Sequence, residues 1–157
     1  MGRNVRYVAA AAMLLTVVGG LVAQAGTGVL DTPKTIVLTV HEVKVVPINF
    51  GGDDSTPGNG AMLKYQVFDA TDTTQVGNSH VQCTNQPGKS WAFCTGALMI
   101  TVPEGSGQIV AQGGMQNAPS VDLPIIGGTG DFTNAGGSVH IDFLNQRKAT
   151  YTLNLLP

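Results

Sequence analysis

The chain has 157 residues, only 11% of them charged, and a formal net charge of −2 at pH 7. A weakly acidic chain with so few charges offers no basic surface for nucleic acid or for an anionic membrane, so we expect neither as a partner. The roughly 130 residues that follow the N-terminal segment are enough for one domain with its own core, and not for two.

The N-terminus has the order of features found in an export signal. Arg3 and Arg6 precede an uncharged apolar run, Val8–Val22, and the small-residue motif Ala23-Gln24-Ala25 follows it. Signal peptidase cleaves after such a motif. The apolar run has about 15 residues, whereas a membrane-spanning helix needs roughly 20, so a membrane anchor is the weaker interpretation.

These features divide the chain into three segments. We predict a cleaved signal peptide at residues 1–25, a flexible N-terminal segment at residues 26–33 and a folded domain at residues 34–157. The protein is therefore expected to be secreted into the extracellular space, with no stable membrane insertion after cleavage.

Alternation of apolar and polar residues dominates the folded domain, and turn residues such as Gly, Pro and Asn interrupt it. Eight short strands with hairpin-length connections indicate an all-β fold, either an eight-stranded antiparallel up-and-down β-barrel or a sandwich. A closed barrel of eight strands has room for side chains or for one small ligand. The predicted strands are Lys34–Phe50, Met62–Asp69, Val76–Thr84, Trp91–Val102, Gln108–Gly114, Val121–Ile126, Ser138–Leu144 and Thr150–Leu156.

The two cysteines, Cys83 and Cys94, flank a predicted hairpin. Pro87-Gly88 forms a turn signal midway between them, so a hairpin centred after Gly88 places the two cysteines directly opposite each other. Facing residues of antiparallel strands are close enough for a disulfide, and export favours the oxidised pair. A reactive or redox-active pair is the alternative, although such pairs usually have a C-x-x-C spacing.

Three segments in the C-terminal half carry a recognisable pattern. Cys94-Thr95-Gly96 opens a strand, Gly107–Gly113 follows, and the glycine-rich run Ile126–Val139 completes it. This pattern resembles that of the allene oxide cyclase and dirigent barrel superfamily, and the likeness covers roughly residues 34–156. The resemblance implies an eight-stranded antiparallel barrel with a hydrophobic cavity, assembled as a homodimer or homotrimer.

The glycine-rich run has a second interpretation as a phosphate-binding loop. Such a loop leads into a helix whose N-terminal amides contact the phosphate. Here the glycines lead into an alternating strand that contains Val139, Ile141 and Phe143. We therefore interpret the glycines as structural, because they allow a tight crossing of neighbouring strands.

The resemblance also implies positions that could act on a substrate. Allene oxide cyclases carry an acid on the first strand, which Glu42 matches, while Lys44 replaces an asparagine. Tyr65 falls at another polar position of the family, Cys83 falls at a pocket cysteine, and Met115 replaces a tyrosine. Most of the family's catalytic residues are therefore exchanged in this chain.

Glu42 is the first candidate for chemistry. The alternation places Leu38, Val40, Glu42 and Lys44 on one face of the first strand, which we expect to be the inner face. Burial there would raise the pKa of the carboxyl group and suit it to general acid or base catalysis. Alternatively, Glu42 pairs with Lys44, or both face water.

The sequence thus predicts two catalytic residues and a set of ligand-binding residues. No cofactor motif is present, and His41, His80 and His140 lie on separate strands without a second metal ligand at short spacing, so we expect neither cofactor nor metal. The catalytic candidates are Glu42 and Tyr65, and the ligand-binding candidates are Leu38, Val40, Lys44, Phe68 and Met115.

These candidates are consistent with three functions. The first is a cofactor-free cyclase or isomerase that acts on a lipophilic substrate, mainly by orienting it. The second is a non-catalytic dirigent-like or carrier protein that binds a hydrophobic small molecule. The third is an extracellular structural or interaction domain with a packed interior. Whether the protein is an enzyme stays open at this point.

Overall fold

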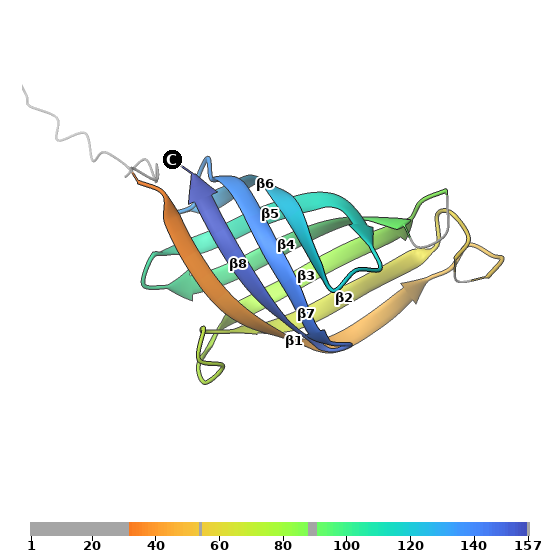
Figure 1. Cartoon of the computed structure of the whole chain (residues 1–157), viewed down its shortest axis with the longest axis horizontal. Coiled ribbons are helices and arrows are strands. Elements are labelled where there is room, and N and C mark those ends of the chain that lie inside the picture. Colours follow the sequence, from red (N-terminus) through yellow and green to blue (C-terminus); the bar gives the residue numbers. More distant parts are fainter. Residues whose placement is uncertain (1–31, 54, 88–90, 157) are drawn as a thin grey trace, which may run out of the picture.

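The structure is a computed structural model that describes residues 32–53, 55–87 and 91–156. Each strand pairs antiparallel with the next one in the chain, and the first pairs with the last, so the sheet closes into a barrel (Figure 1). The predicted eight-stranded antiparallel barrel is therefore confirmed. The strands are β1 (Lys34–Ile48), β2 (Gly60–Phe68), β3 (Gln75–Asn85), β4 (Trp91–Val102), β5 (Gly105–Gln116), β6 (Ser120–Gly130), β7 (Gly136–Asn145) and β8 (Lys148–Leu156).

The predicted signal peptide and the flexible N-terminal segment precede the barrel in the chain. The signal peptide proposed for residues 1–25 lies outside the described residues, as does most of the segment 26–33. Within the described ranges, no helix is long and apolar enough to cross a membrane.

The glycine-rich run has a structural role. It forms the end of β6 as far as Gly130, a short turn, and the beginning of β7. Gly130 has a φ of +64°, and a Cβ there would lie 3.1 Å from the Cα of Gly107 on the neighbouring strand. Only glycine fits such a close approach in the left-handed region. The run enters a strand and not a helix, which agrees with the structural interpretation.

One end of the barrel is filled by side chains. Phe132, in the turn between β6 and β7, is fully buried in the hydrophobic core. Gly105, at the start of β5, lies next to this ring, because a Cβ there would be 3.3 Å from Phe132 Cζ. Phe132 therefore closes the end of the barrel at which β5 begins. The buried residues around it include Ile36, Leu38, Val40, Val67, Ile100, Leu153 and Leu155.

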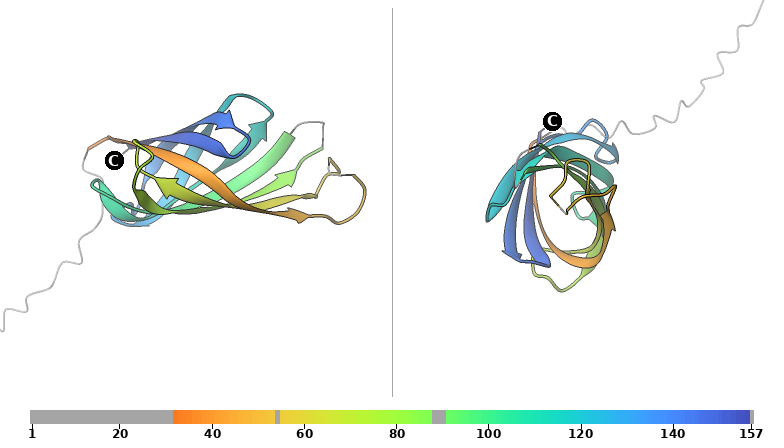
Figure 2. Two further views of the ribbon diagram at one scale, coloured as in Figure 1. Left: turned by 90° about the horizontal axis from the view of Figure 1, so that it is seen from below. Right: turned by 90° about the vertical axis from the view of Figure 1, so that its right-hand side faces the viewer.

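The opposite end of the barrel is only partly closed. The pairing of β1 with β8 ends at His41 and Lys148, and the pairing of β5 with β6 covers only residues 107–111 of β5. Beyond these points, β1 to β4 continue as a curved sheet that extends past the ends of β7 and β8 (Figures 1 and 2). The sheet is therefore not closed all the way round at this end.

A β-bulge in β1 changes which residues face the interior. Glu42 pairs with Tyr65 on β2, but Lys44 pairs with Lys64, so Val43 is an extra residue. An extra residue reverses the inward and outward alternation beyond it. The prediction that Lys44 shares the inner face with Glu42 is wrong for this reason, since Lys44 and Lys64 are both exposed on the outer face.

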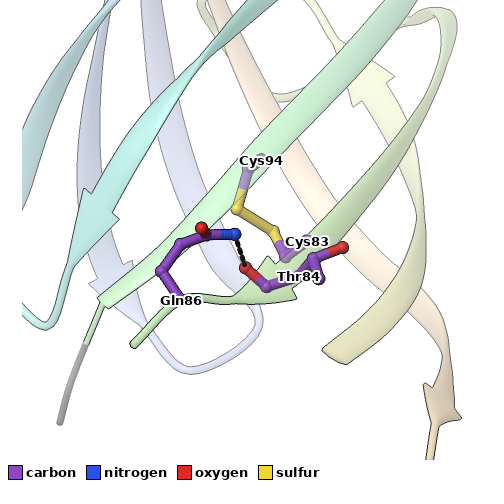
Figure 3. Close-up of a disulfide and its surroundings, with 4 residues drawn as sticks. All are labelled: Cys83, Thr84, Gln86 and Cys94. Carbon is purple, nitrogen blue, oxygen red and sulfur yellow. Dashed lines mark hydrogen bonds between the residues drawn. A yellow bond between two sulfur atoms is a disulfide. The ribbon is translucent and has the colours of Figure 1, made fainter. Parts of the chain in front are cut away.

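The predicted disulfide between Cys83 and Cys94 is present. The two residues are direct partners in the β3–β4 pair, with their Cα atoms 4.0 Å apart and an S–S bond of 2.02 Å. Figure 3 shows the bond beside the end of β3, where Gln86 Nε2 donates a hydrogen bond to the Thr84 carbonyl oxygen. The bond joins the two strands near the open end of the barrel.

The outer face of β6 and β7 carries a histidine between two carboxylates. His140 Nδ1 lies 2.9 Å from Asp122 Oδ1, and His140 Nε2 lies 3.2 Å from Asp142 Oδ1. The hydrogen bond to Asp122 raises the pKa of His140 above its ordinary value of 6.5, and the charge of Asp142 adds to this effect. The protonated imidazole is therefore favoured in the folded protein.

Replacement of Phe132 by Ala should destabilise the barrel by about 3 to 5 kcal/mol, the usual cost of removing a buried phenylalanine. Phe50, which is 84% exposed, provides the matched control, and Phe50→Ala should leave stability almost unchanged. Denaturant unfolding of both variants measures the two free energies. Equal effects of the two substitutions would contradict the closing role of Phe132.

Replacement of Asp122 by Asn should lower the pKa of His140 toward its ordinary value, as followed by the chemical shifts of the imidazole ring. Because the pKa is raised in the folded state, the stabilisation by this group is complete below the unfolded pKa and is lost as pH rises through the folded pKa. Between the unfolded and the folded pKa of His140, the melting temperature of the variant should therefore depend less on pH than that of the wild type. An unchanged His140 pKa in the variant would exclude Asp122 as its cause.

Candidate functional site

The interior of the barrel contains a cavity of about 260 Å³ that all eight strands line. This volume is slightly below the usual range for small-molecule sites, about 300 to 1,000 Å³. Most of the lining is aliphatic or aromatic, and the disulfide forms part of the wall. The lining residues are Glu42, Leu63, Tyr65, Ser79, Val81, Cys83, Cys94, Gly96, Leu98, Ile109, Ala111, Met115, Leu123, Val139, Ile141, Phe143, Gln146, Tyr151 and Leu153.

Small residues on neighbouring strands create the space. Gly96 on β4 is the direct partner of Ala111 on β5 and of Val81 on β3, and all three line the cavity. Ser79 lies two positions before Val81 on the same face of β3. A side chain as large as leucine at Gly96 or Ala111 would occupy the cavity volume. The small side chains at these positions therefore leave part of the barrel interior empty.

The polar part of the lining centres on Glu42. Glu42 is the last inward residue of β1 before the bulge, and its backbone N–H donates to the Arg147 carbonyl oxygen over 2.8 Å. Across the β1–β2 pair it faces Tyr65, which in turn faces Ser79 on β3. The strand register therefore places a carboxylate, a phenol and a hydroxyl in one row on the cavity wall.

Tyr151 completes this polar group from β8. Burial raises the pKa of Tyr65 to about 12, and the negative charge of Glu42 adds to the shift. Burial also raises the pKa of Tyr151, with a contribution from Tyr65. Both phenols are therefore protonated at any physiological pH and can donate hydrogen bonds to a ligand.

The structure brings together some of the predicted site residues. Glu42, Tyr65 and Met115 line the cavity, together with Cys83 and Cys94. Their proposed roles in catalysis and binding stay predictions.

Four other predicted ligand-binding residues lie elsewhere. Leu38 and Val40 point inward but belong to the packed core near the closed end, with 1% and 0% exposure. Lys44 lies on the outer face because of the bulge. Phe68 is on the outer face as well, since its neighbour Val67 is buried, and its ring packs edge-on against that of His41, with centroids 5.0 Å apart.

Three polar residues of the lining were not predicted from the sequence. Tyr151 was detectable, because it alternates with the apolar residues Ala149 and Leu153 on β8. Ser79 alternates with Val81 in the same way on β3. Gln146, in the turn between β7 and β8, carries no such signal.

The described residues contain no group of three or more His, Cys, Asp or Glu side chains arranged to hold a metal ion.

No protein-family model matches the sequence, and no curated protein matches it. Solved structures do match the barrel. A structure titled "Pyocyanin demethylase" has 21% sequence identity and a TM-score of 0.67, over 78% of this chain and 100% of that one. A pterocarpan synthase dirigent protein has 15% identity and a TM-score of 0.67, over 79% and 87% of the two chains. An exo-specific intermolecular Diels-Alderase has 12% identity and a TM-score of 0.61, over 79% and 94%.

The chain has the allene oxide cyclase and dirigent-like barrel fold. The resemblance drawn from the glycine-rich run is thus confirmed for the fold.

Replacement of Glu42 by Gln should lower the pKa of Tyr65, because the substitution removes the negative charge that opposes ionisation of the phenol. The pKa should stay above the ordinary value of 10, since the burial of the ring is unchanged. An alkaline titration followed by the NMR shift of the tyrosine ζ carbon measures it. Glu104 is the control, because it lies in the turn between β4 and β5 and does not line the cavity, so Glu104→Gln should have no effect.

Proposed function

We propose that the protein is a secreted, cofactor-free cyclase or isomerase that binds a lipophilic small molecule in the barrel. The observation that carries this proposal is the cavity of about 260 Å³, in which one carboxylate and two neutral phenols share a mostly apolar wall. A flexible apolar substrate held in such a space is restricted to few conformations. Orientation of this kind can contribute several kcal/mol, on the order of 7 to 11, to lowering a barrier.

Glu42 and Tyr65 are the residues proposed for proton transfer. Glu42 would accept or donate a proton at a carbon or oxygen of the bound molecule, and Tyr65 would donate a hydrogen bond to an oxygen on which negative charge develops. Their direct pairing across β1 and β2 places both on the same part of the wall. Removal of a general acid or base of this kind typically costs about 10²- to 10⁴-fold in rate.

Non-catalytic binding is the second candidate. It is favoured by the predominantly apolar lining, which suits a carrier or a dirigent-like guide of a reactive intermediate. Both candidates share the proposed extracellular location, which the disulfide supports because such bonds persist in oxidising compartments.

Native mass spectrometry of the protein isolated from the culture medium of its host tests whether the cavity is occupied. We expect a retained apolar molecule in the wild type and its loss from Ala111→Leu, which fills the cavity. Ala97 is the matched control, because it lies between the cavity-lining residues Gly96 and Leu98 and so points outward. Ala97→Leu should retain the molecule. Absence of any retained molecule from every form would contradict small-molecule binding.

Incubation of the identified molecule or its open-chain precursor with wild-type protein and with Glu42→Gln separates the two candidates. Turnover by the wild type and a loss of about 100-fold or more in the variant, at unchanged thermal stability, would support the enzyme. Equal turnover by both forms would remove Glu42 from the mechanism. Turnover by neither form would contradict the enzyme and favour non-catalytic binding.

A further inference from the structure

The charge of the cavity is unbalanced. Among the residues that the structure describes, Glu42 is the only charged side chain in the lining, and no described lysine, arginine or histidine belongs to it. Among the described residues, the Glu42 carboxylate forms no ion pair, whereas Asp72, Asp122 and Asp142 all do so on the outer surface. Within the described part of the chain, the cavity wall therefore carries one carboxyl group and no cationic side chain to pair with it.

The cationic residues nearest to Glu42, either in sequence or through backbone pairing, do not compensate it. Lys44 faces outward beyond the bulge. Arg147 contributes its backbone carbonyl to the Glu42 N–H and is not part of the lining. Tyr65 and Tyr151 are neutral phenols, because burial raises the pKa of both. A carboxylate in an apolar surrounding is costly unless a cation or a proton accompanies it.

Aromatic rings accompany this carboxylate. Tyr65, Tyr151 and Phe143 belong to the same lining, from three different strands. The electron-rich faces of such rings attract cations, and groups of aromatic residues bind quaternary ammonium compounds in this way. A carboxylate together with three aromatic side chains provides both interactions that stabilise an organic cation in an apolar site.

The volume of the cavity favours an organic cation over a bare metal ion. A space of about 260 Å³ that offers a single carboxylate does not suit a bare metal ion, which needs several oxygen, nitrogen or sulfur ligands at short distance. An organic cation with its charge spread over an apolar frame would fill the volume, contact the aliphatic wall and pair with Glu42.

We propose that this cavity selects an organic monocation, aromatic or quaternary, and disfavours molecules that carry a carboxylate. This inference rests on the proposed small-molecule function of the same cavity and specifies the charge of its ligand. The negative charge of Glu42 is the selective element, and the rings of Tyr65, Tyr151 and Phe143 assist it.

Three probes of similar size and different charge test the proposal: N-methylquinolinium, 1-methylnaphthalene and 1-naphthoate. Isothermal titration calorimetry gives the dissociation constants for the wild type and for Glu42→Gln. We expect the wild type to bind the cation more tightly than the anion. The substitution should weaken binding of the cation roughly tenfold, strengthen binding of the anion and leave the neutral probe unchanged.

Two variants serve as controls. Glu104→Gln removes the same charge from a turn outside the cavity and should change none of the three constants. Glu42→Asp keeps the charge on the wall and should keep the preference for the cation, which also covers the case that Glu42→Gln does not fold.

The results separate this inference from the proposed function. If 1-naphthoate binds the wild type more tightly than N-methylquinolinium, or if Glu42→Gln shifts all three constants in the same direction, the charge selection is wrong and the small-molecule site stands. If none of the three probes binds, both fail.

Discussion

The pairing of β1 with β8 closes the barrel, and the rest of the structure depends on where that pairing ends. It ends at His41, although β1 continues to Ile48. Up to His41, the barrel is closed on all sides, and Phe132 is buried at its end. Beyond His41, β1 has a neighbour on one side only, and the sheet is no longer closed all the way round. Glu42 is the first residue past this boundary, and the hydrogen bond from its backbone to Arg147 lies at the edge of the closed part.

The bulge at Val43 follows directly from this position. A strand with one neighbour is free to accommodate an extra residue, and bulges are common where pairing ends and next to active sites. The bulge separates the two charged residues that stand close together in the sequence, because Glu42 keeps the inward direction and Lys44 takes the outward one. Without the extra residue, the lysine would lie beside the carboxylate on the cavity wall and neutralise it. The lack of a cationic partner for Glu42 among the described residues of the cavity wall is thus a consequence of backbone geometry.

Most of the fold could be predicted from the sequence, because alternation reports which residues share a face and the turn residues report where strands end. The Pro-Gly turn signal predicted the Cys83–Cys94 pair, and the alternation predicted the inward direction of Glu42. It failed for Lys44, since a bulge leaves no mark in the pattern of apolar residues. It also failed to separate Leu38 and Val40 from the cavity. These residues do face inward, but the side chain that fills their end of the barrel, Phe132, comes from a turn far along the chain.

The distribution of side-chain size argues against a barrel whose interior serves stability alone. A packed core of this fold would place leucine or isoleucine at the inward positions of β3 to β5, because empty volume costs free energy. Ser79, Gly96 and Ala111 stand there instead, while the polar residues Tyr65 and Tyr151 stand on β2 and β8. Small and polar residues at inward positions both reduce stability, and such local departures from an optimal core are expected where a site has to hold something else. The packed residues around Phe132, which follow the rules of core packing, supply stability that the cavity-lining part of the barrel lacks.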